Sequence, residues 1–132
     1  MDTSNSALIL LYVGFVWLVV IHTLEEISSG VMEIQLGHIK MTKNRYLLAA
    51  GGITTLNMLT LALLVLNIPA GIYLGLFTSA ILGVLQAVVH FIGYMREGKR
   101  MRGLGAGFYS AIPLAIAGLI VFMQLLRLVL SR

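Results

Sequence analysis

The sequence predicts an all-α fold, an integral membrane four-helix bundle with short loops. Of its 132 residues, 59% are hydrophobic and only 11% carry a charge, whereas a soluble domain has about 25% charged residues. Four apolar runs approach the ~20 residues that cross a ~30 Å hydrocarbon core. Because lipid leaves no water to satisfy backbone groups, each run is expected to be helical. This composition excludes an ordinary cytosolic enzyme, a disordered regulator and a nucleic-acid-binding domain.

The predicted transmembrane helices form a single domain over residues 1–132, with spans at about 7–26, 46–66, 72–95 and 108–128. The first span is apolar up to His22, and the second contains no charged residue. In the third span the strongly polar members are Gln86 and His90. The fourth span is apolar, and Arg127 lies near its end.

The three connections between the spans differ in kind. Residues 67–71 form a short uncharged turn, in which Pro69 ends one helix. The first connection is longer, and its segment 27–39 mixes polar and apolar residues, which makes it a candidate interfacial helix. We interpret His38 within it as an interfacial loop residue. The basic, glycine-rich connection at 96–107 either binds a lipid phosphate or only sets the topology.

Charge asymmetry between the connections predicts the orientation in the membrane. The first and third connections hold seven cations, whereas the N-terminus and the second connection hold none: Lys40, Lys43, Arg45, Arg96, Lys99, Arg100 and Arg102. The C-terminal end adds Arg127 and Arg132. Because positive loops stay in the cytoplasm, we expect a multi-pass protein of the cell (inner) membrane with both termini outside.

Ionisable residues at the ends of two spans are the candidates for chemistry, because such groups are costly in lipid. His22 lies one helical turn before both Glu25 and Glu26. On the third span, Gln86, His90 and Tyr94 are spaced by four and share a face.

Counting along the helices suggests that these two groups meet near the cytoplasmic leaflet. His22 follows Ala7 by 15 residues and His90 follows Ile72 by 18, or about 22 and 27 Å of helix. Asn57, about 18 Å beyond Arg45, would form the floor of a pocket between them. Tyr109, at the start of the fourth span, would form part of its roof.

Two kinds of chemistry fit these residues. The chain has no cysteine, so a divalent transition metal (Zn, Fe or Mn) would need nitrogen and oxygen ligands. The candidate ligands are His22, Glu25, Glu26 and His90. The alternative is metal-free acid–base catalysis, because a carboxylate beside a histidine can relay protons. The candidate catalytic residues are Glu26, Tyr94 and Asn57. The structural alternatives are that the glutamates are solvated at a helix end and that His90 only bonds Gln86 or a backbone carbonyl.

The segment His22-Thr23-Leu24-Glu25-Glu26 resembles the signature of the HXXEE-domain family, small bacterial integral membrane proteins. His90 corresponds to a further histidine of that family's pattern. The family's Tyr-x-Pro-Gly element is absent, and residues 103–109 (GLGAGFY) stand in its place. Since the family has no settled function, the resemblance points to His22, Glu25, Glu26 and His90 as site residues without implying a reaction.

Three functions are compatible with these features. The first is an intramembrane enzyme, metal-dependent or acid–base, that acts on a membrane lipid or another apolar small molecule. The second is an accessory or structural subunit whose polar cluster locks helix packing. The third is a small dimeric proton-coupled transporter. A homo-oligomer is expected from the short chain, and a nucleic-acid partner is not.

Overall fold

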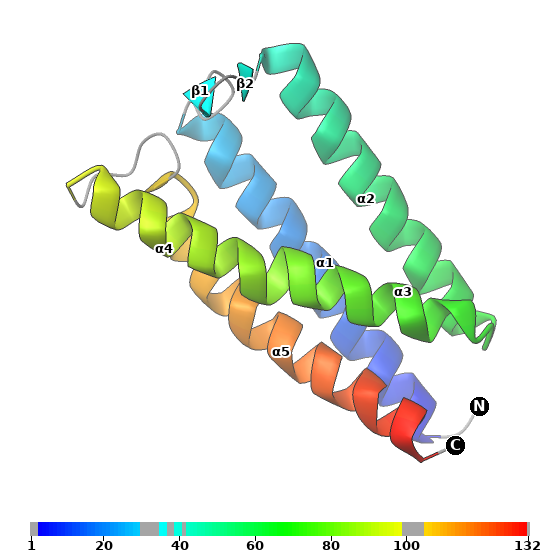
Figure 1. Ribbon diagram of the computed structural model, residues 1–132. Helices are drawn as coiled ribbons and strands as arrows, with labels where there is room; N and C mark the ends of the chain where they lie inside the picture. The colour runs from blue at the N-terminus through cyan, green and yellow to red at the C-terminus, as the bar shows by residue number, and fades with distance from the viewer. Residues whose placement is uncertain (1–2, 30–34, 37–38, 41, 99–104, 132) are drawn as a thin grey trace.

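Four long helical segments make up most of the part of the chain that the structure describes (Figure 1). The computed structural model describes residues 3–29, 35–36, 39–40, 42–98 and 105–131. The segments are α1 (Thr3–Ser28), α2 (Lys43–Val65), the continuous run α3 (Ala70–Thr78), η1 (Ser79–Leu85) and α4 (Gln86–Arg96), and α5 (Phe108–Leu130). The all-α prediction is confirmed, and each helical segment ends within four residues of the predicted span. Both ends of the chain lie at the same end of the bundle (Figure 1).

The connection between α1 and α2 contains a pair of short strands. Strand β1 (Gln35–Leu36) pairs with β2 (Ile39–Lys40) in antiparallel fashion. The prediction of an interfacial helix over 27–39 is therefore wrong for the described part of this segment beyond Ser28. Two glycines in the sequence of this segment, each costing about 1 kcal/mol in a helix interior, disfavour a helix here. His38 lies outside the described residues.

A Schellman motif makes the turn between α2 and α3. Asn67 adopts a left-handed conformation (φ 56°), and the backbone N–H groups of Asn67 and Ile68 donate to the carbonyls of Leu64 and Leu63. Gly71 then brings α3 against α2, because a Cβ at this position would lie 2.8 Å from the Leu64 nitrogen. The uncharged turn predicted at 67–71 is thus a tight helical hairpin.

The core lies where α1 and α5 pack against each other and against the third span. The third span is α-helical at both ends and π-helical over η1. In a regular α-helix, Ile72 and His90 would face the same way, since 18 residues make five turns. The π-helical segment, with its wider turns, changes this alignment. Accordingly α3 packs on α2 and α5, while α4 packs on α5.

Two glycines allow the third span and α5 to touch through their backbones. A Cβ at Gly83 would lie 2.8 Å from the Gly118 Cα, and a Cβ at Gly118 would lie 2.7 Å from the Gly83 Cα. Small residues at such crossings permit close helix packing in membranes. This contact brings the start of α4 close to the first half of α5.

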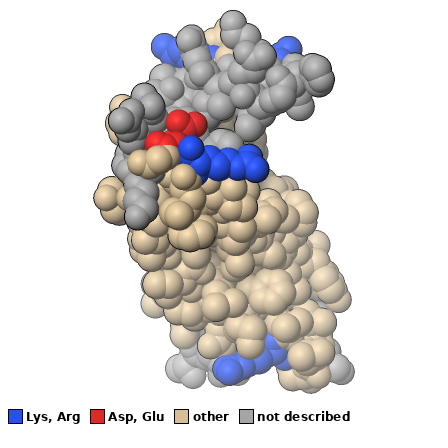
Figure 2. All heavy atoms as spheres, turned by 60° about the vertical axis from the view of Figure 1, so that its left-hand side comes forward, with Lys and Arg blue, Asp and Glu red and all other residues tan. Residues whose placement is uncertain are grey.

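The outer surface is suited to lipid. All four helical segments are long and apolar enough to cross a membrane. Large apolar side chains face outward along the bundle, among them Leu10, Trp17, Leu48 and Phe77. Figure 2 shows a broad surface without Lys, Arg, Asp or Glu between two ends that carry charges. These features are those of a multi-pass membrane protein.

Candidate metal centre

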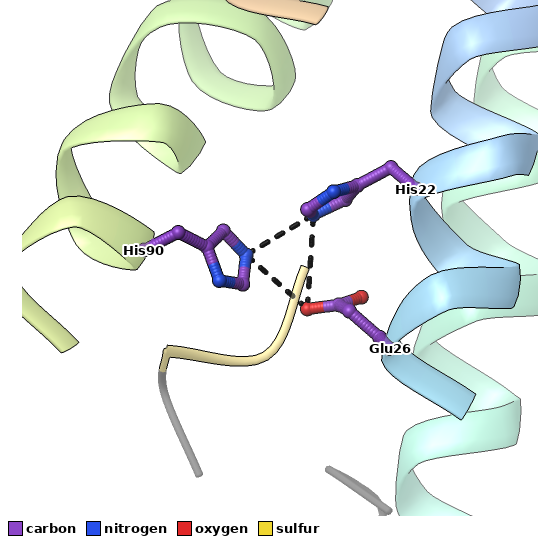
Figure 3. A group of neighbouring side chains, drawn as sticks. All are labelled: His22, Glu26 and His90. Carbon is purple, nitrogen blue, oxygen red and sulfur yellow. Dashed lines mark hydrogen bonds and ion pairs between the residues drawn. The ribbon is translucent and has the colours of Figure 1, made fainter. Parts of the chain in front are cut away.

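Three side chains from two helices converge at the end of the bundle away from the termini (Figure 3). His22 Nε2 lies 3.0 Å from His90 Nε2. Glu26 Oε1 lies 3.3 Å from His90 Nε2 and 3.8 Å from His22 Nε2. The residues are 4%, 2% and 9% exposed for His22, His90 and Glu26. The cluster is thus closed off from its surroundings, and its three atoms face one another.

Helix geometry explains why these residues meet. His22 and Glu26 are separated by four residues on α1 and share the face that carries the core. His22 lies six residues before the end of α1, and His90 lies six residues before the end of α4. Since α1 and α4 run in the same direction across the bundle (Figure 1), the two histidines reach the same level.

A second layer of hydrogen bonds holds the three side chains. The Tyr46 hydroxyl on α2 donates to Glu26 Oε2 over 2.7 Å, which leaves Oε1 for the histidines. The Ser110 hydroxyl on α5 lies 2.8 Å from His22 Nδ1. Gln86, one turn before His90, places its amide nitrogen 2.9 Å from His90 Nε2 and 3.4 Å from His22 Nε2. Every helical segment therefore supports the cluster.

The Ser110 bonds favour one tautomer of His22. The Ser110 hydroxyl donates to the Gly107 carbonyl, and its oxygen then accepts from His22 Nδ1–H. This tautomer leaves a lone pair on His22 Nε2, which lies 3.0 Å from His90 Nε2 in a hydrogen bond. A cation between the two nitrogens and Glu26 Oε1 would displace the proton of this bond, because metal ligands bind in their deprotonated form.

The spacing of the three atoms fits a transition metal. A point equidistant from corners 3.0, 3.3 and 3.8 Å apart lies about 2.0 Å from each, within the range of zinc–nitrogen and zinc–oxygen bonds. Two histidines and one carboxylate hold catalytic zinc and non-haem iron. The bond from His22 Nδ1–H to Ser110 is of the kind that orients metal-binding histidines. The donor set and its supports therefore suit zinc, iron or manganese.

Gly107 makes the cluster possible at the start of α5. Its φ is 81°, a conformation that favours glycine. A Cβ there would lie 2.8 Å from His22 Cε1 and 3.1 Å from Glu26 Cγ. A glycine is thus required both by the backbone and by the two side chains that pass it. The sequence signal for this residue is the glycine-rich stretch before the fourth span.

Of the four predicted metal ligands, the structure brings together His22, Glu26 and His90 but not Glu25. Glu25 is half-buried, and its Oε2 accepts a 2.9 Å hydrogen bond from the Ser110 backbone nitrogen. A carboxylate at this place satisfies a free N–H in the first turn of α5. Adjacent residues on a helix point about 100° apart, so only Glu26 is directed at the histidines.

Two predicted catalytic residues lie apart from the converging atoms. Tyr94, one turn beyond His90, stacks on Phe108 with ring centroids 4.5 Å apart and planes at 3°. Asn57 lies eleven residues beyond Tyr46 on α2, or about 16 Å of helix. Its side chain bonds Tyr12 and the carbonyl of Ile53. The predicted pocket floor is therefore wrong. The predicted roof residue, Tyr109, is 64% exposed.

Asn57 belongs to a second buried polar cluster in the middle of the bundle. The Tyr12 hydroxyl donates to Asn57 Oδ1 over 3.1 Å and lies 2.9 Å from Thr78 Oγ1. All three residues are fully buried, as is Thr60 beside them. Between this cluster and His22, the buried residues of α1 are the apolar Phe15, Val16 and Val19.

Comparison of the chain with protein family models, with curated proteins and with solved structures finds no match. Membership of the HXXEE-domain family, expected from His22, Glu25, Glu26 and His90, therefore stays a prediction.

Proposed function

We propose that the protein is an intramembrane enzyme that depends on a transition metal and acts on a lipid or another apolar substrate. Its metal would be held by His22, Glu26 and His90. The convergence of these three ligand atoms at metal-binding distance is the observation that carries the proposal. A bound metal supplies a Lewis acid and lowers the pKa of a bound water.

The kind of protein ligands favours catalysis over a purely structural ion. Structural zinc sites are closed by cysteine and histidine ligands, whereas two histidines and a glutamate hold zinc in catalytic sites, where water or substrate also binds the metal. The three atoms from His22, Glu26 and His90 match the catalytic pattern. The chain's own residues would then orient the centre: Tyr46 holds Glu26, and Ser110 holds His22.

The surroundings of the centre favour an apolar substrate. A hollow of about 470 Å³ lies between α4 and α5, and its lining is wholly apolar: Ala87, Val88, Phe91, Phe108, Ile112, Ala115 and Ile116. Phe91 follows His90 in the sequence, and Phe108 follows Gly107. A substrate arriving from the bilayer would therefore meet apolar surface at the level of the centre.

The proposal places the centre at the cytoplasmic side of the cell membrane, with both termini outside. Lys43, Arg45 and Arg96 lie at the ends of α2 and α4 next to the centre, whereas Arg127 lies near the termini. The positive-inside rule assigns the end of the bundle that carries Lys43, Arg45 and Arg96 to the cytoplasm.

Metal analysis of the full-length protein purified in detergent tests the proposal. We expect close to one transition-metal ion per chain, lost in Glu26→Gln and kept in Glu25→Gln. The two variants change neighbouring carboxylates in the same way, but only Glu26 faces the histidines. Absence of metal from protein prepared without chelators and reloaded with Zn²⁺, Fe²⁺ or Mn²⁺ would reject the metal centre and leave acid–base catalysis.

A structural subunit is the second candidate, because the described residues contain no buried side-chain nitrogen or oxygen without a hydrogen-bond partner. If the cluster only locks the helices, Glu26→Gln should lower the melting temperature of protein that never binds metal. The proton-coupled transporter is disfavoured, because the buried apolar residues Phe15, Val16 and Val19 separate the ionisable cluster from the polar residues at mid-bundle.

A further inference from the structure

Gln86 is the polar side chain in the cluster that the three-ligand centre does not use. It is half-buried, and its amide nitrogen approaches both histidines at the nitrogens that face Glu26. An amide has a donor end and an acceptor end. The identity of the end directed at the centre thus determines whether Gln86 bonds to the imidazoles or to an ion between them.

With respect to the two histidines, the amide lies close to where an additional ligand would lie. An ion at the centre of the three-atom triangle lies nearly in the plane of those atoms, as the distances above require. A fourth ligand about 2.1 Å above this plane would be about 2.9 Å from each of the three atoms. The Gln86 amide nitrogen lies 2.9 Å from His90 Nε2 and 3.4 Å from His22 Nε2.

Occupied imidazole lone pairs would reverse the preference of this amide. The amide nitrogen lies within hydrogen-bond distance of the two Nε2 atoms, but neither nitrogen can accept a hydrogen bond once its lone pair binds an ion. An NH₂ group cannot itself be a ligand, because it has no free lone pair. A half-turn of the amide exchanges nitrogen for oxygen at the same place, and amide oxygens are metal ligands.

We propose that Gln86 is a fourth ligand of the centre and binds the ion through its amide oxygen. This inference rests on the proposed metal centre. Gln86 carries no charge, and an amide oxygen suits a transition metal less well than an imidazole nitrogen does. It is therefore the ligand that an incoming oxygen group of the substrate can displace most readily.

Cobalt(II) binding tests the assignment without any assay of activity. The full-length protein in detergent, stripped with chelator, is titrated with Co²⁺ while its visible absorption is recorded. We expect Gln86→Leu to lower the Co²⁺ affinity by at least about tenfold, the lower limit for losing a supporting group of a metal site. We also expect it to change the absorption bands, since their intensity depends on coordination number. Gln86→Glu restores an oxygen ligand and should recover both.

Controls separate this inference from the proposed centre. Gln124 is exposed on α5, so Gln124→Leu should leave Co²⁺ binding and absorption unchanged. Azide added to the Gln86→Leu complex should alter its bands at concentrations that leave the wild-type complex unaffected, because the variant has lost one ligand.

The outcomes distinguish the role of Gln86 from the centre itself. Wild-type affinity and bands in a folded Gln86→Leu protein, with binding still lost in His22→Ala, would overturn the role of Gln86 alone. Co²⁺ binding that survives His22→Ala would overturn the centre as well. If Gln86→Leu does not fold, Gln86→Glu provides the test, because its new carboxylate should strengthen Co²⁺ binding. Weaker Co²⁺ binding in this variant than in the wild type would overturn the assignment.

Discussion

The two buried polar clusters of this bundle are made in different ways. At mid-bundle, Tyr12 bonds Asn57 and Thr78, and the remaining donors are used locally. Asn57 Nδ2 donates to the carbonyl of Ile53, and Thr78 and Thr60 donate to carbonyls of their own helices. Each donor there has an acceptor without help from any other species. The cluster is self-sufficient and ties α1, α2 and the third span together.

At the other cluster three atoms that can bind a metal share one small space. His22 Nε2, His90 Nε2 and Glu26 Oε1 lie 3.0 to 3.8 Å apart. Tyr46 donates to the other carboxylate oxygen of Glu26, and Ser110 bonds the other ring nitrogen of His22, so both supports leave the facing atoms for a cation. Burial alone therefore does not separate a binding site from a packing contact in a membrane bundle. The kind of atoms that face one another does.

The largest expected difference between the clusters is in metal affinity. His90→Ala removes a ligand of the proposed centre and should lower Zn²⁺ affinity by at least about 100-fold, or about 2.7 kcal/mol. Asn57→Ala removes a group of equal burial from the other cluster and should leave affinity unchanged while the protein remains folded. Isothermal titration in detergent measures both. Equal losses in the two variants would show that the clusters are not independent.

An intermediate loss of Zn²⁺ affinity is expected when Gly107 is changed, and a second glycine with positive φ provides the control. Gly107 (φ 81°) and Gly98 (φ 65°) carry a similar backbone strain when changed to alanine, but only Gly107 abuts His22. Gly107→Ala should weaken Zn²⁺ binding by roughly 10- to 100-fold, as for other residues that position metal ligands. Gly98→Ala, where the new Cβ meets nothing within 4 Å, serves as the matched control. Unaltered Zn²⁺ binding by a folded Gly107→Ala protein would contradict the role given to this glycine.

The smallest expected effect is on stability at mid-bundle. Tyr12→Phe removes a hydroxyl that joins Asn57 to Thr78, and hydrogen bonds between membrane helices contribute about 0.6 kcal/mol on average. We expect a small decrease in melting temperature and no change in metal content. Tyr73→Phe, at a side chain that is 59% exposed, should change neither. Loss of metal from folded Tyr12→Phe would show that the mid-bundle cluster contributes to metal binding and would contradict the separate roles given to the two clusters.

The sequence was sufficient for the helices and for the three converging residues. Apolar length located the spans, and the four-residue spacing of His22 and Glu26 placed both on one face of α1. It was not sufficient to separate Glu25 from Glu26. That choice depends on where α5 begins, because Ser110 offers its backbone N–H to Glu25.

The predicted depth of Asn57 was wrong because it was counted from the opposite side of the membrane. The depths of His22 and His90 were counted from the side of the termini, whereas that of Asn57 was counted from Arg45. His22 and His90 each lie six residues from the helix end next to the centre, whereas Asn57 lies fourteen residues from the corresponding end of α2. Tyr46 lies only three residues from that end, which is why it reaches Glu26. Counting every helix from the same side would have identified Tyr46 as the partner from α2. The left-handed turn at Gly107 and the amide contacts of Gln86 depend on packing that no spacing rule describes.

The close contact between Gly107 and His22 also limits which substitutions this position can accept during evolution. Most positions facing lipid accept any apolar residue, so relatives can diverge there freely. At position 107 the smallest possible addition, one methyl group, meets an imidazole at 2.8 Å. A lineage that keeps the histidines and the carboxylate must therefore keep this glycine, and one that loses it is expected to lose the histidines' role soon after.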